Sequence, residues 1–346
     1  MRYRLLGKSG LRVSELCLGT MTFGEDLGWG SPKEESRKVY DAFLEAGGNF
    51  IDTANIYTNG TSESFLGEFM QGHRERLVLA TKYTLGSPVN DPNAAGNQRK
   101  NMMQAVEASL KRLQTDYIDL YWLHIWDQLT PIEEVMRAFD DLVRQGKILY
   151  AGVSDMPAWV VAQGNTLAEL RGWTPFIGLQ IEYSLIERTP ERELLPMAAS
   201  LGLGITAWSP LAGGVLTGKY ADPKPGEAGK KRFDTPEMAE FHASGSVATT
   251  IAREVQAVAR ECGRSPAQVA LAWLRHRPVP VIPIIGARKL EQLKDNLESI
   301  EVKLDRAHLD RLEEVSRVEL GFPHDFFKKE HVRTIVFGGM RDLIDA

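Results

Sequence analysis

Eight short apolar runs alternate with longer stretches of helical periodicity, and this alternation constrains the fold of the 346-residue chain more than any other feature. Strands that alternate with helices form a parallel sheet, and eight of them favour a sheet closed into a barrel. A Gly-rich turn between Tyr3–Leu6 and Leu11–Val13 predicts a hairpin before the first run. We therefore predict an α/β fold, a (β/α)8 TIM barrel with an N-terminal β-hairpin, in which residues 1–346 form a single domain. The runs are Leu16–Leu18, Asn49–Ile51, Leu77–Thr81, Ile118–Leu123, Ile148–Val153, Gly178–Ile181, Gly204–Ala207 and Val279–Ile282.

Three helix starts share one sequence form, in which a hydroxyl residue precedes Pro and is followed three residues later by Glu or Gln. They begin at Ser31, Thr130 and Ser265. This form predicts a capping box with proline at the first helical position. An extra helix is expected over Ala248–Cys262.

Two segments interrupt the alternation of strands and helices. Residues 219–246 are rich in Gly, Pro and charge, and they predict a long loop after the seventh strand. Residues 319–346 lack a clear period and are interpreted as an irregular C-terminal tail.

Composition narrows the class of protein. A formal net charge of −5 argues against nucleic acid or an anionic membrane as the main partner. Only Cys17 and Cys262 are present, which favours a reducing, cytoplasmic setting over a disulfide framework. The N-terminus lacks a signal-peptide core, no apolar run approaches the length of a membrane span, and no His or Cys spacing predicts a metal site.

Four polar residues are expected to meet at one mouth of the predicted barrel. Asp52, Lys82 and His124 each follow an apolar run, and Tyr57 lies in the loop after Asp52. The carboxyl ends of barrel strands converge, and barrel active sites form there. Each residue alone has an ordinary structural interpretation, such as an ion pair or a packed ring. Together they favour catalysis, because a phenol beside an ammonium can give a proton to a carbonyl oxygen while an imidazole orients that oxygen. None of the four is a hydride source, so a cofactor must supply the hydride.

Several motifs in the expected order resemble those of the aldo-keto reductases, in the branch that contains potassium-channel β-subunits and bacterial relatives. They run from the first strand to the eighth. The matching stretches are Leu18–Gly24, Phe50–Tyr57, Leu79–Lys82, Asp119–His124, Gly152–Asp155, Gln180–Ser184, Ala207–Leu211 and Ile282–Arg288.

The resemblance implies a barrel that binds NADP(H) across its strand ends, with Tyr57 as the catalytic acid of a tetrad completed by Asp52, Lys82 and His124. It also implies a carboxamide site, a stacking Trp208, pyrophosphate contacts, and Arg288 at the 2′-phosphate. The implied cofactor-binding residues are Gly19, Thr20, Met21, Asp52, Ser154, Asp155, Gln180, Trp208, Ser209, Pro210, Leu211, Gly213, Lys219, Arg232, Gly286, Arg288, Gln292 and Asn296.

One position departs from the family pattern, since relatives often carry Asn where this chain has Asp155. An ionised aspartate can accept a hydrogen bond from the carboxamide but cannot donate one. The substrate is expected to contact Tyr57 and His124, with Trp29, Trp126 and Phe322–Phe327 as candidates for an apolar wall.

The predicted function is NADPH-dependent reduction of a small-molecule aldehyde or ketone to an alcohol. A homo-oligomer is possible. The alternative from a different class is a nicotinamide-binding regulatory protein, like a channel β-subunit, that turns over little. A metal-dependent barrel hydrolase ranks lower because the chain lacks the ligand spacing.

Overall fold

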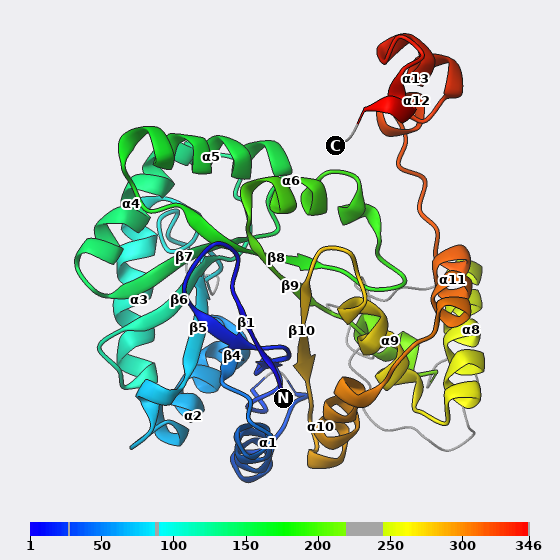
Figure 1. Cartoon of the computed structure of the whole chain (residues 1–346). Coiled ribbons are helices and arrows are strands. Elements are labelled where there is room, and N and C mark those ends of the chain that lie inside the picture. The colour runs from blue at the N-terminus through cyan, green and yellow to red at the C-terminus, as the bar shows by residue number, and fades with distance from the viewer. Residues whose placement is uncertain (27, 87–89, 219–244, 345–346) are drawn as a thin grey trace.

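Eight parallel strands close into a barrel with helices outside it, as Figure 1 shows for this computed structural model. The structure describes residues 1–344 except 27, 87–89 and 219–244. The predicted fold class is therefore confirmed. In barrel order the strands are β10 (Val281–Gly286), β3 (Cys17–Gly19), β4 (Phe50–Asp52), β5 (Val78–Tyr83), β6 (Ile118–Leu123), β7 (Ile148–Ser154), β8 (Phe176–Glu182) and β9 (Gly204–Trp208).

The helices around the barrel include the predicted extra helix, which is α8. Their bounds are α1 (Lys33–Glu45), α2 (Thr61–Phe69), α3 (Arg99–Leu113), α4 (Ile132–Arg144), α5 (Ala158–Arg171), α6 (Leu194–Leu201), α8 (Ser246–Cys262), α9 (Pro266–Arg275), α10 (Leu290–Leu297) and α11 (Arg306–Val315).

Only one of the three predicted capping boxes forms. Ser265 and Gln268 make the reciprocal pair at α9. At α1 and α4 the prediction is wrong, because the proline itself has extended ψ and occupies the N-cap. The displaced hydroxyls bond elsewhere: Ser31 Oγ donates to the carbonyl of Arg288 at 2.8 Å, and Thr130 Oγ1 donates to Asp127 at 2.7 Å.

An apolar cluster fills the interior near the N-terminal ends of the strands. The predicted hairpin, β1 (Tyr3–Leu5) with β2 (Arg12–Ser14), is present, and Leu6 and Val13 pack into this cluster. Figure 1 shows the hairpin lying across that end of the barrel. Trp122 is fully buried, and a Cβ on Gly152 would lie 2.3 Å from its ring. This end is therefore closed, and the chemistry is left to the opposite end.

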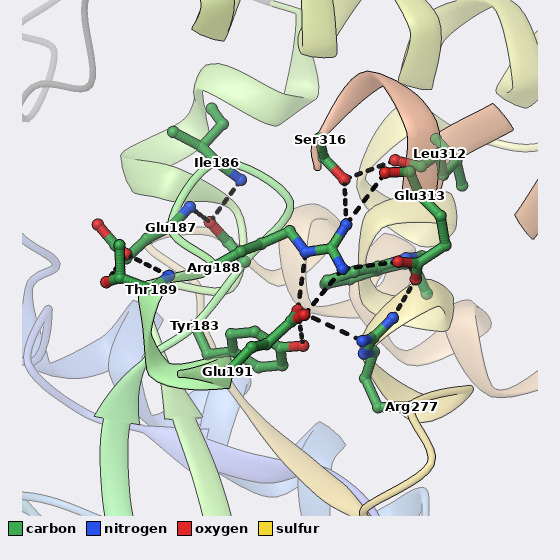
Figure 2. A network of polar contacts seen from close by, with 12 residues as sticks. Tyr183, Ile186, Glu187, Arg188, Thr189, Glu191, Arg277, Leu312, Glu313 and Ser316 are labelled. Atoms are coloured by element: carbon green, nitrogen blue, oxygen red, sulfur yellow. Dashed lines mark hydrogen bonds and ion pairs between the residues drawn. The ribbon is translucent and has the colours of Figure 1, made fainter. Parts of the chain in front are cut away.

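A buried polar network anchors the segment that follows β8 (Figure 2). The Arg188 guanidinium donates to Glu191 at 2.7 Å, to Glu313 of α11 at 2.6 Å and to Ser316 at 2.8 Å. Tyr183, directly after β8, donates to Glu191 at 2.6 Å. Arg188 is only 6% exposed, so its guanidinium needs acceptors within the protein, and each of its three nitrogens donates to one of these side chains. The network thus ties the end of β8 to α11.

The C-terminal tail differs from its prediction in two ways. It contains two short helices, α12 (His324–Phe327) and α13 (Glu330–Val336), rather than irregular chain. Figure 1 shows both helices standing away from the barrel strands, so the Phe322–Phe327 segment does not line the mouth. Phe322 is 85% exposed, and no described residue after Ser316 is buried. The sequence pattern of the tail could not predict this position, because it carries no information on where the tail packs against the rest of the chain.

Helices of membrane-spanning length and hydropathy are absent from the described part of the chain.

Candidate active site

Lys82 lies at the centre of the predicted tetrad. Its ammonium donates to the carboxylate of Asp52, to the carbonyl of Thr53 at 2.7 Å and to Tyr57 Oη at 3.1 Å. Asp52 ends β4, Lys82 belongs to β5, and Tyr57 opens the short helix η1 (Tyr57–Gly60). The three predicted side chains therefore meet at the carboxyl ends of adjacent strands.

Charge inside this cluster is balanced by contact. Lys82 is fully buried. Burial alone would lower the pKa of its ammonium, but Asp52 and Tyr57 outweigh that effect and raise the pKa above its usual value. The other carboxylate oxygen of Asp52 accepts from Gln180 Nε2 at 2.9 Å. The site consequently holds a permanent ammonium beside a phenol.

The backbone after Tyr57 is strained. Thr58 and Asn59 have positive φ angles of 46° and 55°, and Gly60 follows at 92°. A β-branched residue rarely adopts this conformation, so the surroundings must hold it. Thr58 Oγ1 donates to the carbonyl of Phe23 at 2.6 Å and accepts from the backbone of Ser62 at 3.1 Å. These bonds fix the turn that carries the phenol.

His124 directly follows β6 and presents its ring edge-on to Tyr57. The ring centroids are 5.9 Å apart at 82°. Burial, with a smaller effect from Lys82, lowers the pKa of His124 well below its usual value, so the imidazole is neutral. Among the described residues its buried Nδ1 has no hydrogen-bond partner, while its backbone N–H donates to Thr84 Oγ1 at 3.3 Å. All four predicted catalytic residues thus lie together.

The residues predicted for the nicotinamide lie at the ends of β7, β8 and β9. Ser154 and Gln180 are buried, and Gln180 already donates to Asp52. Asp155 Oδ1 accepts from the indole Nε1 of Trp208 at 3.0 Å. Burial raises the pKa of Asp155 to about 6, although the bond from Trp208 opposes the rise. The contact between Asp155 and Trp208 was not predicted.

A tight turn after β9 offers a backbone cradle. Ser209, Ala212, Gly213 and Gly214 all have positive φ, and Pro210 and Leu211 complete the turn into η4 (Ala212–Thr217). The Ser209 hydroxyl accepts from the backbone of Gly213 at 3.2 Å. Turns that alternate between right- and left-handed residues expose N–H groups in concave arrays that suit anions. The turn is thus chemically suited to the pyrophosphate implied for these residues.

The predicted adenosine-end residues gather after β10. Gly286 is exposed at the strand end, and its register partner is Gly19. A Cβ on Gly19 would lie 2.7 Å from Ile284, so that strand end requires glycine. Arg288 is partly buried, its backbone N–H donates to Gln292 at 2.9 Å, and Asn296 donates to the carbonyl of Gly286 at 3.4 Å.

The remaining predicted cofactor residues divide into two groups. Thr20 is buried, and its hydroxyl donates to the carbonyl of Asp52 at 3.1 Å, so it supports the tetrad directly. Met21 is partly buried beside it. Lys219 and Arg232 lie outside the described residues, as does most of the predicted 219–246 loop.

The residues predicted for an apolar substrate wall differ in how far they are exposed. Trp29 is 7% exposed and packed within the loop after β3, so burial leaves little of its ring for a substrate. Trp126 is partly buried, and its ring meets Trp159 edge-to-face with centroids 5.9 Å apart. Trp159 is 63% exposed, and it was not among the residues predicted from sequence for the substrate wall. Its position two residues after the Pro157 that follows β7 was the available signal, since that places it at the mouth.

A cluster of three or more His, Cys, Asp or Glu side chains suited to a metal ion is not found within the described ranges. The groups present at the mouth are a phenol, an ammonium, a carboxylate and a neutral imidazole. This set can transfer a proton to or from an oxygen, but it carries no redox-active group of its own.

Comparison with known proteins identifies the family. The sequence model of the Aldo/keto reductase family matches residues 15–317. An uncharacterized oxidoreductase, YrpG of Bacillus subtilis, is 41% identical over 327 residues, covering 91% of this chain and 96% of that protein. Norsolorinic acid reductase of Aspergillus flavus is 38% identical, covering 94% and 83%. An NADP(+) aryl-alcohol dehydrogenase of Phanerodontia chrysosporium is also 38% identical, covering 94% and 89%. The chain belongs to the aldo/keto reductase family of oxidoreductases, which act on small-molecule carbonyl compounds.

Proposed function

We propose that this chain reduces aldehydes or ketones to alcohols with NADPH, and that Tyr57 gives the proton to the carbonyl oxygen. The observation that carries the proposal is the position of Lys82 Nζ, which contacts the Asp52 carboxylate and lies 3.1 Å from Tyr57 Oη. A buried ammonium at this distance stabilises the phenolate that remains once the proton has left. In the reverse direction the same phenolate would take the proton from an alcohol.

Each side chain of the tetrad has a distinct role in the proposal. Asp52 keeps Lys82 charged and fixes its direction. His124 donates a neutral hydrogen bond to the substrate oxygen and thereby turns the carbonyl toward Tyr57. The tautomer with hydrogen on Nε2 fits this role, because the buried and unpartnered Nδ1 would otherwise carry an unsatisfied N–H.

NADPH, when bound, supplies the hydride that none of these side chains can supply. We assign Ser154, Asp155 and Gln180 to its carboxamide and the face of Trp208 to its ring. The turn from Ser209 to Gly213 suits the pyrophosphate through its N–H groups. Arg288, two residues before α10, suits a phosphate monoester, because a guanidinium can bind it in a bidentate manner.

Aromatic carbonyl compounds are the substrate class we propose. Two tryptophans of the mouth, Trp126 and Trp159, form an edge-to-face pair, and the exposed Trp159 ring is available to a planar substrate. The relative from Phanerodontia chrysosporium is named an aryl-alcohol dehydrogenase, which supports an aromatic substrate class.

The test is NADPH oxidation, followed by its absorbance, against aromatic, aliphatic and dicarbonyl aldehydes. Tyr57→Phe is the matched variant, because it keeps the ring and removes only the hydroxyl. The variant should bind NADPH as the wild type does and lose about 100-fold or more of kcat. Wild-type turnover in Tyr57→Phe would refute the proton-donor role. Tight NADPH binding by the wild type without turnover on any aldehyde would favour the regulatory alternative.

A further inference from the structure

Asp155 and Trp208 meet across an intervening strand. Asp155 follows β7 and Trp208 ends β9, while β8 lies between them in the barrel. The indole N–H of Trp208 donates to Asp155 Oδ1 at 3.0 Å. An indole has a single polar hydrogen, so one acceptor decides how the ring is turned.

Asp155 is itself held in place. Its backbone N–H donates to the carbonyl of Gln180 at 3.3 Å, and its carbonyl accepts from the backbone of Trp126 at 3.4 Å. Its φ angle of 44° puts it in the left-handed region, which aspartate tolerates better than most residues. The backbone of Asp155, directly after β7, is therefore tied to β8 and to the loop after β6, and its carboxylate accepts the bond from the indole.

Keeping a carboxylate here has a cost, because burial raises the pKa of Asp155 to about 6. An asparagine oxygen would accept from the indole without that cost. A carboxylate, however, keeps further acceptor sites after one bond is made, whereas the second group of an asparagine is a donor. The acidic residue thus suits a site in which two donors converge.

We propose that Asp155 is a positioning residue that fixes the indole of Trp208, so that the wall for the nicotinamide ring is already set before the cofactor binds. The inference rests on the proposed function for its purpose, but the bond itself joins two side chains of this chain. A ring that is oriented in advance does not have to be ordered on binding, and this lowers the cost of association.

The test compares three single variants and one double variant. Asp155→Gly removes the carboxylate, and glycine accepts the positive φ angle without strain. Asp155→Asn keeps an acceptor oxygen of the same shape. Trp208→Phe keeps an aromatic ring but has no N–H to donate. The double variant Asp155→Gly/Trp208→Phe closes the cycle.

The first readout uses the protein without cofactor. The near-ultraviolet circular dichroism of the wild type minus that of Trp208→Phe isolates the signal of one of seven tryptophans. Asp155→Gly should lose most of this difference signal, and Asp155→Asn should keep it. An unchanged signal in Asp155→Gly would overturn the proposal. Should Asp155→Gly fail to fold, loss of the signal in Asp155→Asn would overturn it and retention would support it, since that variant keeps the acceptor.

The second readout is the Kd for NADPH, measured by its fluorescence. Asp155→Gly should weaken binding about tenfold in the wild-type background but only about threefold or less beside Trp208→Phe. Equal losses in both backgrounds would mean that Asp155 acts independently of Trp208, which overturns the proposal. A wild type that does not bind NADPH would instead defeat the proposed function, while the cofactor-free spectra would still test the bond.

Discussion

Replacing Asp155 by Asn should make the cofactor-free protein more stable at neutral and alkaline pH. Burial raises the pKa of Asp155 to about 6 from an unfolded value of 3.8. A group whose folded pKa is raised stabilises the fold only while it is protonated. That contribution is complete below the unfolded pKa, and it is lost as the pH rises through the folded pKa. Asparagine is neutral at every pH and can accept the same bond from Trp208.

The size of the effect follows from the two pKa values. A pKa difference of about two units corresponds to about 3 kcal/mol of unfolding free energy. The ionised wild type lacks this stabilisation at pH 8. At pH 5 the folded carboxyl is mostly protonated while the unfolded one is ionised, so the gain from Asn falls to about half. The gain should vanish below about pH 4. Lys82 is the charged group that acts on Asp155, and it stays protonated over this range.

Urea unfolding of both proteins at pH 5, 6, 7 and 8 measures this dependence. Asp140→Asn is the matched control with the opposite sign. Although burial opposes it, hydrogen bonds from Arg144 and Thr174 lower the pKa of Asp140, so its ionised form stabilises the fold above the unfolded pKa. That variant should be less stable at pH 8. A stability difference for Asp155→Asn that does not grow with pH would refute the reasoning.

Four further predictions concern separate parts of the molecule. Lys82→Met should lower kcat by about 100-fold or more. In urea its free energy of unfolding should fall by about 3–5 kcal/mol, because the buried Asp52 carboxylate would then keep, among the described residues, only the bond from Gln180. Arg288→Ala should weaken NADPH binding about tenfold more than NADH binding in fluorescence titrations, and equal losses would contradict the 2′-phosphate role. Trp159→Ala should lower kcat/KM about threefold or more for aromatic aldehydes while sparing short aliphatic ones. Deleting residues 321–346 should shift Tm by less than about 2 °C in calorimetry, because no described residue there is buried.

Much of the fold could be predicted from sequence because each strand is a buried apolar run and each helix has its own period. The run Ile118–Leu123 coincides with β6. The run Val279–Ile282 was placed too early, since β10 extends to Gly286. Residues Ile284–Gly286 pair with Cys17–Gly19 near the start of the chain, and a local pattern does not contain that contact. The two capping boxes predicted at α1 and α4 do not form for a different reason, because the sequence form does not determine the ψ angle of its proline.

The tetrad could be predicted because the end of a strand can be located in the sequence, at the end of an apolar run. Asp52, Lys82 and His124 follow apolar runs, so the convergence of strand ends in a barrel brings them together. The bond between Asp155 and Trp208 could not be predicted in this way, because it skips one strand and depends on ring orientation. The predictions for Trp29 and for the C-terminal tail were limited in the same way, because the sequence does not say how a loop or tail packs. Aromatic residues near a mouth in sequence can be buried in a loop, as Trp29 is, or stand away from the barrel.

The proposed chemistry requires that the barrel be closed. In the strand order β4 lies opposite β8, so the bond from Gln180 to Asp52 crosses the barrel. Asp52 thereby has one oxygen set by β8 and the other bonded to Lys82 of β5. The position of the ammonium beside Tyr57 consequently depends on strands from both halves of the chain. Gln180 belongs to β8, and the polar network that begins at Tyr183, directly after β8, ties the end of that strand to α11. The outer helices are thus connected to the placement of the proton donor.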